Sequence, residues 1–309
     1  MSSVRDKTVR LGEHAVTGLW LAPMAGYTDV AFRKLAKEYG AALTVTEMVS
    51  VRGLVRGNEA TEFLLKTTDI EKPSCVQLFG NNPEEFFRAA KILDCDVIDI
   101  NMGCPMPKIV KNGDGSALLD SPSLAGDIVR ATIDGSGKPV TVKTRLGRRM
   151  GELTADKLIE CVEKAGAAAV TLHGRYAEQR YAGVSDRAAC AEIAKRHGVP
   201  IVYNGDICAE DINGDFDCFG AVAVGRAALS DIGIFSGVSA NPFDVAIRHI
   251  ELLKKHFDGR YAVNQARKFF VHYFKSMRGG KSIRAAVNSA TCPDEVIDIL
   301  LESRQKICL

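Results

Sequence analysis

Cys104 lies in a stretch of sequence that favours chemistry rather than packing. It belongs to the segment Asn101-Met102-Gly103-Cys104-Pro105, which follows an apolar run and opens a long loop. A free cysteine is usually a small buried hydrophobe. Here a glycine and a proline flank the thiol, and Lys108 and Lys111 supply positive charge nearby. A general acid or a nucleophile is therefore the favoured interpretation.

Two pairs of basic residues form a second candidate cluster. Lys143 and Arg145 close one apolar run, and His173 and Arg175 close another. In an extended strand, alternation puts both members of each pair on the same side of the chain. Unpaired buried cations are costly, so an anionic group should lie beside them.

That group could be an acid of the chain itself, such as Glu47 or Asp99. A phosphate-bearing cofactor explains the excess of cations more simply. Gly225 and Arg226 follow a further apolar run and lead directly into a predicted helix, which would place backbone N–H groups and a guanidinium together for a phosphate. The segment Asn204-Gly205-Asp206 could also meet a phosphate or ribityl chain, although Asn-Gly is a common turn as well.

From residue 19 onward, short β-branched runs alternate with segments of helical period, the pattern of a parallel sheet with crossover helices. The predicted strands are Leu19 to Pro23, Leu43 to Glu47, Cys75 to Phe79, Val97 to Asn101, Val140 to Thr144, Ala169 to His173, Ile201 to Asn204 and Ala221 to Gly225. The predicted helices between them are Val30 to Tyr39, Pro83 to Leu93, Pro122 to Ile133, Thr154 to Lys164 and Arg187 to His197. Eight such units favour a (β/α)8 TIM barrel over an open doubly wound sheet.

The polar residues at the predicted strand ends support this fold, because the carboxyl ends of all barrel strands converge on one mouth. The residues at these ends are Met24, Glu47, Gln77, Asn101, Lys143, His173, Asn204 and Gly225. Any one of them could be a chance strand terminator, since Asn and Gly are also turn formers. A Lys, a His, a Gln and a Glu together are not explained in that way.

The bulk composition is that of an ordinary globular protein. A length of 309 residues suits one barrel with an appendage, or two domains. No run of eighteen apolar residues and no apolar N-terminal stretch is present, so we expect a cytoplasmic protein with no membrane segment. The nine cysteines show neither CxxC nor Cys/His metal spacing, which favours reduced thiols and no metal site.

Positive charge is concentrated at the C-terminal end. Residues 240–309 hold twelve Lys or Arg and seven Asp or Glu, whereas residues 1–239 hold 28 and 31. From Asn241-Pro242 onward the chain is predicted to be helical, which gives a barrel domain over 1–240 and a helical domain over 241–309. Between Lys255 and Arg284, eight basic residues alternate with aromatic ones. This segment is either a polyanion-binding surface or a solvated helical face whose aromatic residues pack inward.

The motif Asn-Met-Gly-Cys-Pro, followed by Lys108 and by Gly-Ser-Ala-Leu-Leu at residues 115–119, resembles the tRNA-dihydrouridine synthases. The resemblance covers the barrel and much of the C-terminal tail. It implies an FMN-binding (β/α)8 barrel with a C-terminal helical tRNA-binding domain. The implied reaction is reduction of the C5=C6 bond of uridine in tRNA, with NADPH or NADH as the reductant.

The resemblance also assigns roles to residues of this chain. Cys104 would donate a proton to the base. The residues that would contact the isoalloxazine or its polar edge are Pro23, Met24, Ala25, Gln77, Lys143 and His173. Those that would hold the ribityl phosphate end are Asn204, Gly205, Asp206, Gly225 and Arg226. The residues that would line the substrate pocket are Asn101, Arg145 and Arg175.

The chain departs from the family pattern at two places. Related synthases commonly continue from the Gly-Arg pair into Gly-Asn-Pro-Trp or a similar run, whereas this chain reads Ala227-Ala228-Leu229-Ser230-Asp231-Ile232. Asp114 also replaces a small residue between two glycines of the long loop. We therefore expect a differently shaped phosphate end and a shifted loop, with Cys104 and the flavin edge unaffected.

Two other functions remain open from the sequence. A related FMN barrel that acts on a free pyrimidine or another small alkene would keep the barrel motifs without needing the basic tail. A non-catalytic tRNA-binding factor would keep the tail and hold flavin only for stability.

Overall fold

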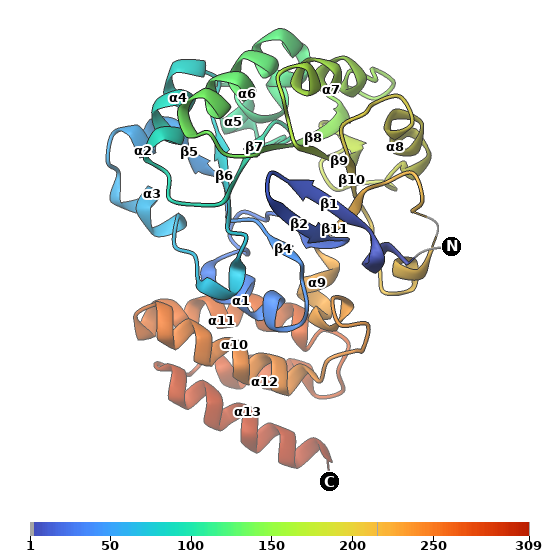
Figure 1. Ribbon diagram of the computed structural model, residues 1–309. Coiled ribbons are helices and arrows are strands. Elements are labelled where there is room, and N and C mark those ends of the chain that lie inside the picture. The colour runs from blue at the N-terminus through green and yellow to red at the C-terminus, as the bar shows by residue number, and fades with distance from the viewer. Residues whose placement is uncertain (1–2, 215, 309) are drawn as a thin grey trace.

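A ring of parallel strands forms the centre of the computed structural model, which describes residues 3–214 and 216–308 (Figure 1). The strands of the ring are β3 (Leu19–Leu21), β4 (Leu43–Thr44), β5 (Val49–Ser50), β6 (Cys75–Phe79), β7 (Val97–Asn101), β8 (Val140–Gly147), β9 (Ala169–Tyr176), β10 (Ile201–Asn204) and β11 (Ala221–Val224). Their order is β4-β3-β11-β10-β9-β8-β7-β6-β5, and every pairing is parallel. The predicted (β/α)8 barrel is confirmed.

The second barrel position is split between two short strands. β4 pairs with β3 and β5 pairs with β6, while Val45 bridges Cys75 between them, so the ring closes. The continuous strand predicted from Leu43 to Glu47 is therefore wrong after Thr44. The side chain of Thr46 explains the break, because its hydroxyl accepts the Gln77 N–H at 3.0 Å in place of a backbone carbonyl.

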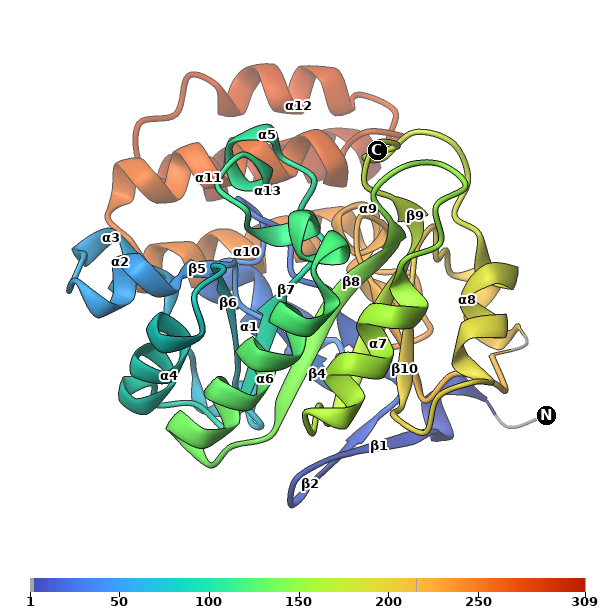
Figure 2. The ribbon, with the colours of Figure 1, turned by 90° about the horizontal axis from the view of Figure 1, so that it is seen from above.

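Helices cover the outside of the ring, with one exception. The helices of this region are α1 (Val30–Glu38), α2 (Val51–Val55), α3 (Glu59–Leu64), α4 (Pro83–Ile92), α5 (Pro107–Val110), α6 (Pro122–Ser136), α7 (Ala155–Lys164), α8 (Arg187–Ala194) and α9 (Ala227–Ser230). The exception is the short α5, which lies in the long loop after β7 at the mouth end of the barrel (Figure 2). The five helices predicted here are present within three residues at each end. Asp29, Asn82 and Asp186 fix three of the starts by accepting N–H groups of the first turn.

A β-hairpin that the sequence did not reveal covers the N-terminal end of the barrel (Figure 1). Its strands are β1 (Thr8–Leu11) and β2 (His14–Thr17), which pair antiparallel. Val9, Leu11 and Val16 are buried and pack with inward-facing residues of the ring such as Trp20. The hairpin therefore keeps water out of the barrel floor, opposite the mouth.

The C-terminal tail is helical, as predicted. It contains α10 (Pro242–His256), α11 (Gly259–Tyr273), α12 (Gly280–Val287) and α13 (Pro293–Cys308). Asn241 caps α10, whose first residue is a proline. Phe269 of α11 packs 5.0 Å from the ring of Phe32 in α1, and the buried core runs from the barrel into the tail. A division into domains at residue 240 stays a prediction. Within the described residues, none of the helices combines the length and the apolar character needed to cross a membrane.

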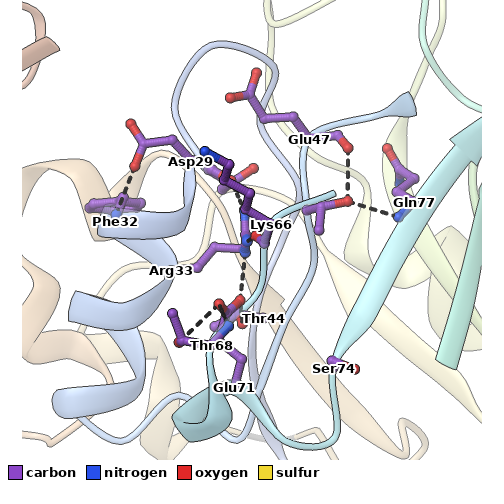
Figure 3. A network of polar contacts seen from close by, with 12 residues as sticks. Asp29, Phe32, Arg33, Thr44, Glu47, Lys66, Thr68, Glu71, Ser74 and Gln77 are labelled. Carbon is purple, nitrogen blue, oxygen red and sulfur yellow. Dashed lines mark hydrogen bonds and ion pairs between the residues drawn. The ribbon is translucent and has the colours of Figure 1, made fainter. Parts of the chain in front are cut away.

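A buried ion pair holds the first helix against the second crossover (Figure 3). Arg33 donates to Glu71 at 2.6 Å, and both side chains are at most 2% exposed. The same guanidinium donates to the carbonyl of Thr28 at 2.6 Å, and Thr44 donates to the carboxylate of Glu71 at 3.2 Å. Because Thr28 follows the loop after β3, this pair fixes one side of the barrel mouth.

We expect Arg33→Met to reduce the free energy of unfolding by about 3–5 kcal/mol, because it leaves the Glu71 carboxylate buried without its counter-ion. Urea unfolding followed by the fluorescence of Trp20, the single tryptophan, measures the loss. The matched control is Arg52→Met, which removes an exposed pair with Glu85 and should leave the free energy of unfolding close to the wild-type value. Equal losses in the two variants would contradict the structural role of the buried pair.

Candidate active site

A buried chain of hydrogen bonds joins three neighbouring strands inside the barrel and leads to Asn101 at the end of β7. Gln77 on β6 donates to Asp99 on β7 at 2.6 Å, and Thr141 on β8 donates to the other carboxylate oxygen of Asp99 at 2.6 Å. Asn101 donates to the side-chain oxygen of Gln77 at 3.0 Å. Burial raises the pKa of Asp99, although the bonds from Thr141 and Gln77 oppose the rise. These hydrogen bonds fix the orientation of the side-chain amides of Gln77 and Asn101.

The orientation of Asn101 sets the position of Cys104. Its side-chain oxygen accepts the N–H groups of Gly103 at 3.2 Å and of Cys104 at 2.9 Å. The long loop then folds back, and Ser116 N–H donates to the Cys104 carbonyl at 3.0 Å. Gly115 allows this close approach, since it has a φ of +61° and a Cβ there would lie 2.8 Å from the same carbonyl.

The thiol of Cys104 is part-buried and remains protonated near neutral pH. Burial raises its pKa above the ordinary value, and this outweighs the opposing effects of the Met106 N–H and of Arg145 and Lys143. The eight cysteines whose side chains the structure describes are all free thiols. A protonated thiol at the mouth can serve as a general acid.

Lys143 is a buried cation whose hydrogen-bond partner is an amide and not an acid. Its ammonium donates to Asn204 at 3.0 Å, and Asn204 in turn donates to the carbonyl of Ala223 at 2.7 Å. Burial, followed by repulsion from Arg145, lowers the pKa of Lys143 to about 8. Among the residues that the structure describes, no ion pair within 4.0 Å involves Lys143 or Arg145. The mouth therefore favours an anionic or electron-rich ligand beside them.

β8 and β9 continue beyond the barrel rim as a two-stranded ribbon, pairing as far as Gly147 and Tyr176. The predicted ends at Thr144 and His173 are therefore too early. Lys143, Arg145, His173 and Arg175 lie inside the strands. The two strands are longer than predicted because they pair with each other beyond the points where their other neighbours end. The sequence of a single strand does not encode this pairing.

Asp206 is the acid that pairs with Arg175, the charged member of the second basic pair, and it also pairs with Arg226. Arg175 donates to it at 2.5 Å and Arg226 at 3.0 Å. The sequence left open that an acid of the chain itself pairs with these cations. Arg175 does have such a partner, but the acid is neither Glu47 nor Asp99. Burial alone would raise the pKa of Asp206, yet the bonds from Arg175 and the Ser185 N–H outweigh it and lower the pKa.

The imidazole of His173 is neutral. Burial lowers its pKa far below the ordinary value, and the surrounding cations Lys143, Arg145 and Arg175 add to the effect. Arg175 lies 3.3 Å from its Nε2. A guanidinium only donates hydrogen bonds, so Nε2 accepts and the proton of the ring is on Nδ1.

The two buried arginines also hold the loop that follows β9. Arg145 donates to the carbonyls of Arg180 at 2.9 Å and Tyr176 at 3.2 Å. Arg175 donates to Ala182 at 3.1 Å and Gly183 at 2.7 Å. Counting its bonds to His173 and Asp206, four of the five N–H groups of Arg175 are used within the chain. A substrate contact of Arg175 stays a prediction, with one donor free for it.

The loop after β3 lies beside the end of β11. A Cβ on Gly225 would lie 3.9 Å from the sulfur of Met24. Pro23 and Met24 are part-buried, and Ala25 is exposed at the mouth. Gly26 donates its N–H to the carboxylate of Glu47, which lies in the break of the second barrel strand. The structure thus brings the first and last predicted strand ends together, as expected for a closed barrel.

Sequence analysis missed one contact from the helical tail. Lys268 of α11 donates to the carbonyl of Gly26 and lies 4.8 Å from the ring centroid of Tyr27. Burial lowers the pKa of Lys268, with Asp29 and Glu47 opposing. Lys268 belongs to the basic aromatic segment, so only its place in that segment could have drawn attention to it.

The two departures from the family pattern serve local structure. Asp231 accepts the N–H groups of Gly233 at 2.8 Å and Ala240 at 3.1 Å, and it accepts from the Ser239 hydroxyl at 2.7 Å. It therefore shapes the connection into the helical tail. Asp114 is buried at the start of the 3-10 turn Gly115–Asp120, and burial raises its pKa.

Comparison with known proteins identifies the family. The family model described as dihydrouridine synthase matches residues 20–308. The chain belongs to the dihydrouridine synthase family. It is 32% identical over 306 residues to a probable tRNA-dihydrouridine synthase of Aquifex aeolicus, covering 93% of this chain and 96% of that one. It is 34% identical over 302 residues to one of Treponema pallidum, covering 88% of each.

Solved structures resemble the barrel at low sequence identity. Histamine dehydrogenase from Rhizobium sp. 4-9 matches with a TM-score of 0.55 and 14% identity, covering 81% of this chain and 51% of that one. Morphinone reductase in complex with tetrahydroNAD matches with a TM-score of 0.53 and 11% identity, covering 78% and 93%. At such identities the likeness shows the fold alone.

We expect Arg175→Met to release the loop after β9, because two loop carbonyls and Asp206 lose their charged donor. Trypsin should then cleave after the exposed Arg180 roughly tenfold faster or more, since each bond to a charged donor is worth about 1.5–3 kcal/mol. Limited proteolysis with mass spectrometry measures the rate. Arg196→Met, which removes a pair with Asp156 on another helix, is the control and should leave the rate unchanged. Similar rates in the two variants would show that Arg175 does not hold the loop.

Proposed function

We propose that this protein is a tRNA-dihydrouridine synthase that reduces the C5=C6 bond of uridine through bound FMN, with NADPH or NADH as the reductant and Cys104 as the proton donor. We place the reaction in the cytoplasm, where its substrate is found. Membership of the dihydrouridine synthase family over residues 20–308 supports the reaction. The observation that carries the mechanism is the part-buried thiol of Cys104, whose pKa burial raises, in the same mouth as Lys143 and Arg145, which form no ion pair within 4.0 Å among the described residues.

The residues at the mouth fit a flavin mononucleotide. Lys143 has no acidic partner within 4.0 Å among the described residues and would face the electron-rich edge of the ring system, together with Gln77. Met24 lies close to Gly225. The segment Pro23 to Ala25 therefore offers an apolar face, and Gly225 offers backbone without a side chain. When bound, FMN would supply hydride transfer from the nicotinamide to C6 of the base.

The phosphate end would use backbone groups and one cation. The helix α9 after Arg226 has only four residues, Ala227–Ser230, so the expected helix terminus is short. Arg226 is 54% exposed and can reach a phosphate, whereas the carboxylate of Asp206 is engaged by Arg175 and Arg226. Asn204, Gly205 and Asp206 would therefore contribute mainly through the turn they form, in which Gly205 has a φ of +143°.

Cys104 delivers a proton to C5 of the base in this proposal, while Asn101 and Arg145 hold the pyrimidine. Transfer leaves a thiolate, which the nearby charges of Lys143 and Arg145 stabilise. Burial lowers the pKa of Arg145 to about 10, so it stays charged at neutral pH. A uridine inside folded tRNA must leave its stack to reach this mouth.

The helical tail offers exposed positive charge for RNA. Phe269, Phe270, Tyr273 and Phe274 are buried, so the aromatic residues of the segment pack inward, as the less specific interpretation of the sequence expected. The cations that point outward are Lys255, Arg260, Lys275, Arg278 and Lys281, and none of these has an acid within 4.0 Å among the described residues. In Figure 2, α12 lies at the end of the barrel opposite the hairpin, on the side of the mouth.

We expect the wild type to be yellow when purified with FMN and to form dihydrouridine in unmodified tRNA. Cys104→Ala should keep the colour and the affinity for tRNA but lose about 10²- to 10⁴-fold in rate, the usual contribution of a general acid. Because the acid must carry its proton, activity should persist through neutral pH and fall as pH rises through the raised pKa of Cys104. Mass spectrometry of digested tRNA measures the product at each pH.

Other outcomes would favour the other functions. Unaltered activity of Cys104→Ala would assign the proton to another group. Comparable rates on free uridine and on tRNA would favour a small-molecule reductase, and a yellow protein that binds tRNA but forms no dihydrouridine would favour a binding factor. A colourless protein that cannot take up FMN would contradict the proposal.

Replacing Lys275, Arg278 and Lys281 together with glutamine should weaken tRNA binding and make it less sensitive to salt. Each lost phosphate contact lowers the slope of log affinity against log salt by about 0.7–0.9, so three contacts lower it by roughly two to three. Filter binding at several salt concentrations measures the slope.

The control replaces three exposed lysines at the C-terminal ends of outer helices, Lys91, Lys164 and Lys195, which lie at the end of the barrel away from the mouth. This variant carries the same change in net charge and should keep the wild-type slope. Equal effects of the two triple variants would indicate a general charge effect, not a surface on the tail.

A further inference from the structure

The loop between β9 and α8 presents an aromatic ring to solvent at the mouth. Tyr181 is 57% exposed, although aromatic side chains of this size are usually buried for most of their surface. Figure 2 shows the loops that follow β8 and β9 rising at the end of the barrel opposite the β1–β2 hairpin. Packing inside the protein does not account for the position of this ring.

Two guanidiniums flank the ring. Arg145 lies 5.8 Å and Arg226 lies 5.2 Å from its centroid. Arg145 is the buried cation beside Cys104, and Arg226 is the exposed cation at the end of β11. Tyr181 thus stands over the opening between the group expected to hold the pyrimidine and the group expected to hold a phosphate.

Hydrogen bonds from two buried arginines hold the backbone on either side of Tyr181. Arg145 binds the carbonyl of Arg180 before it, and Arg175 binds the carbonyls of Ala182 and Gly183 after it. Arg180 itself has a φ of +51°, which is unusual for a residue with a side chain. Two buried arginines therefore stabilise a loop conformation in which the ring of Tyr181 is exposed.

We propose that Tyr181 contacts the substrate by stacking its ring on an unstacked nucleobase of the RNA at the mouth. An exposed aromatic ring flanked by guanidiniums is suited to a nucleobase, because the ring supplies the stacking face and the cations can meet the adjoining phosphate. Arg145 and Arg175 also hold the loop that presents this ring, in addition to the roles proposed for them above. The inference rests on the proposed function, since it names a further contact of the same reaction.

Tyr181→Ala should raise KM for tRNA by about 5- to 150-fold, the usual effect of removing one base-stacking side chain. Tyr181→Phe should remain within about threefold of the wild type, because stacking needs the ring and not the hydroxyl. Tyr181→Leu should resemble the alanine variant, since it keeps apolar bulk without an aromatic face. Steady-state kinetics with unmodified tRNA measures all three.

Three further measurements separate stacking from a structural role. The rate at which NADPH reduces the bound flavin should be unchanged in Tyr181→Ala, as should the trypsin cleavage rate after Arg180. The slope of tRNA affinity against salt should also be unchanged, because stacking releases no counter-ions. Val184→Ala, which removes another exposed apolar side chain of the same loop, is the matched control and should leave KM at the wild-type value.

An unchanged KM in Tyr181→Ala, with the wild type active on tRNA, would overturn this inference and leave the proposed function standing. A phenylalanine variant as impaired as the alanine variant would also overturn it, because a hydroxyl contact would then be responsible. Slower flavin reduction or faster trypsin cleavage in Tyr181→Ala would assign the ring to holding the loop. Failure of the wild type to form dihydrouridine would be a failure of the proposed function instead.

Discussion

The structure of the mouth depends on how this fold accommodates buried positive charge. Lys143, Arg145 and Arg175 project from two adjacent strands into one enclosed region, where charges are costly unless they are paired or hydrogen-bonded. Arg175 is satisfied by Asp206 and by loop carbonyls. Arg145 is satisfied by carbonyls alone, and Lys143 by an amide oxygen. The loops around the mouth therefore take the positions in which their carbonyls meet these donors.

This arrangement divides the cations into two groups with different consequences. The pairing of Arg175 and Arg226 with Asp206 places one carboxylate between two guanidiniums, which leaves one net positive charge and lowers the pKa of the carboxylate. Lys143 and Arg145 have no ion-pair partner within 4.0 Å among the described residues, and burial lowers the pKa of both groups. Burial, with the neighbouring cations adding to it, keeps His173 neutral. In the proposed function, a site of this kind would bind an electron-rich cofactor and would stabilise the thiolate that Cys104 becomes after giving up its proton.

The helical tail is joined to the barrel at the loop that contributes to the mouth. Lys268 reaches the carbonyl of Gly26, while Glu47 accepts the N–H of the same residue, so both sides of this glycine are held by distant elements. The aromatic residues of the tail fill the interface with α1, and the remaining cations stay outside. The basic aromatic segment therefore packs against the barrel with its aromatic residues and exposes its remaining cations to solvent.

The sequence by itself determined the barrel, most helix and strand positions, and the residue types at the mouth, because periodicity, caps and strand-end polarity are local signals. It also singled out Cys104, whose flanking glycine and proline are local too. Only the tertiary structure decided the break in the second strand, the hairpin over the barrel floor, the extension of β8 and β9, and Asp206 as the acid beside Arg175. Each of these depends on which distant segments meet: the Thr46 hydroxyl replaces a strand bond because β6 lies beside it, and the exposed Tyr181 lies in a loop held by two arginines from separate strands.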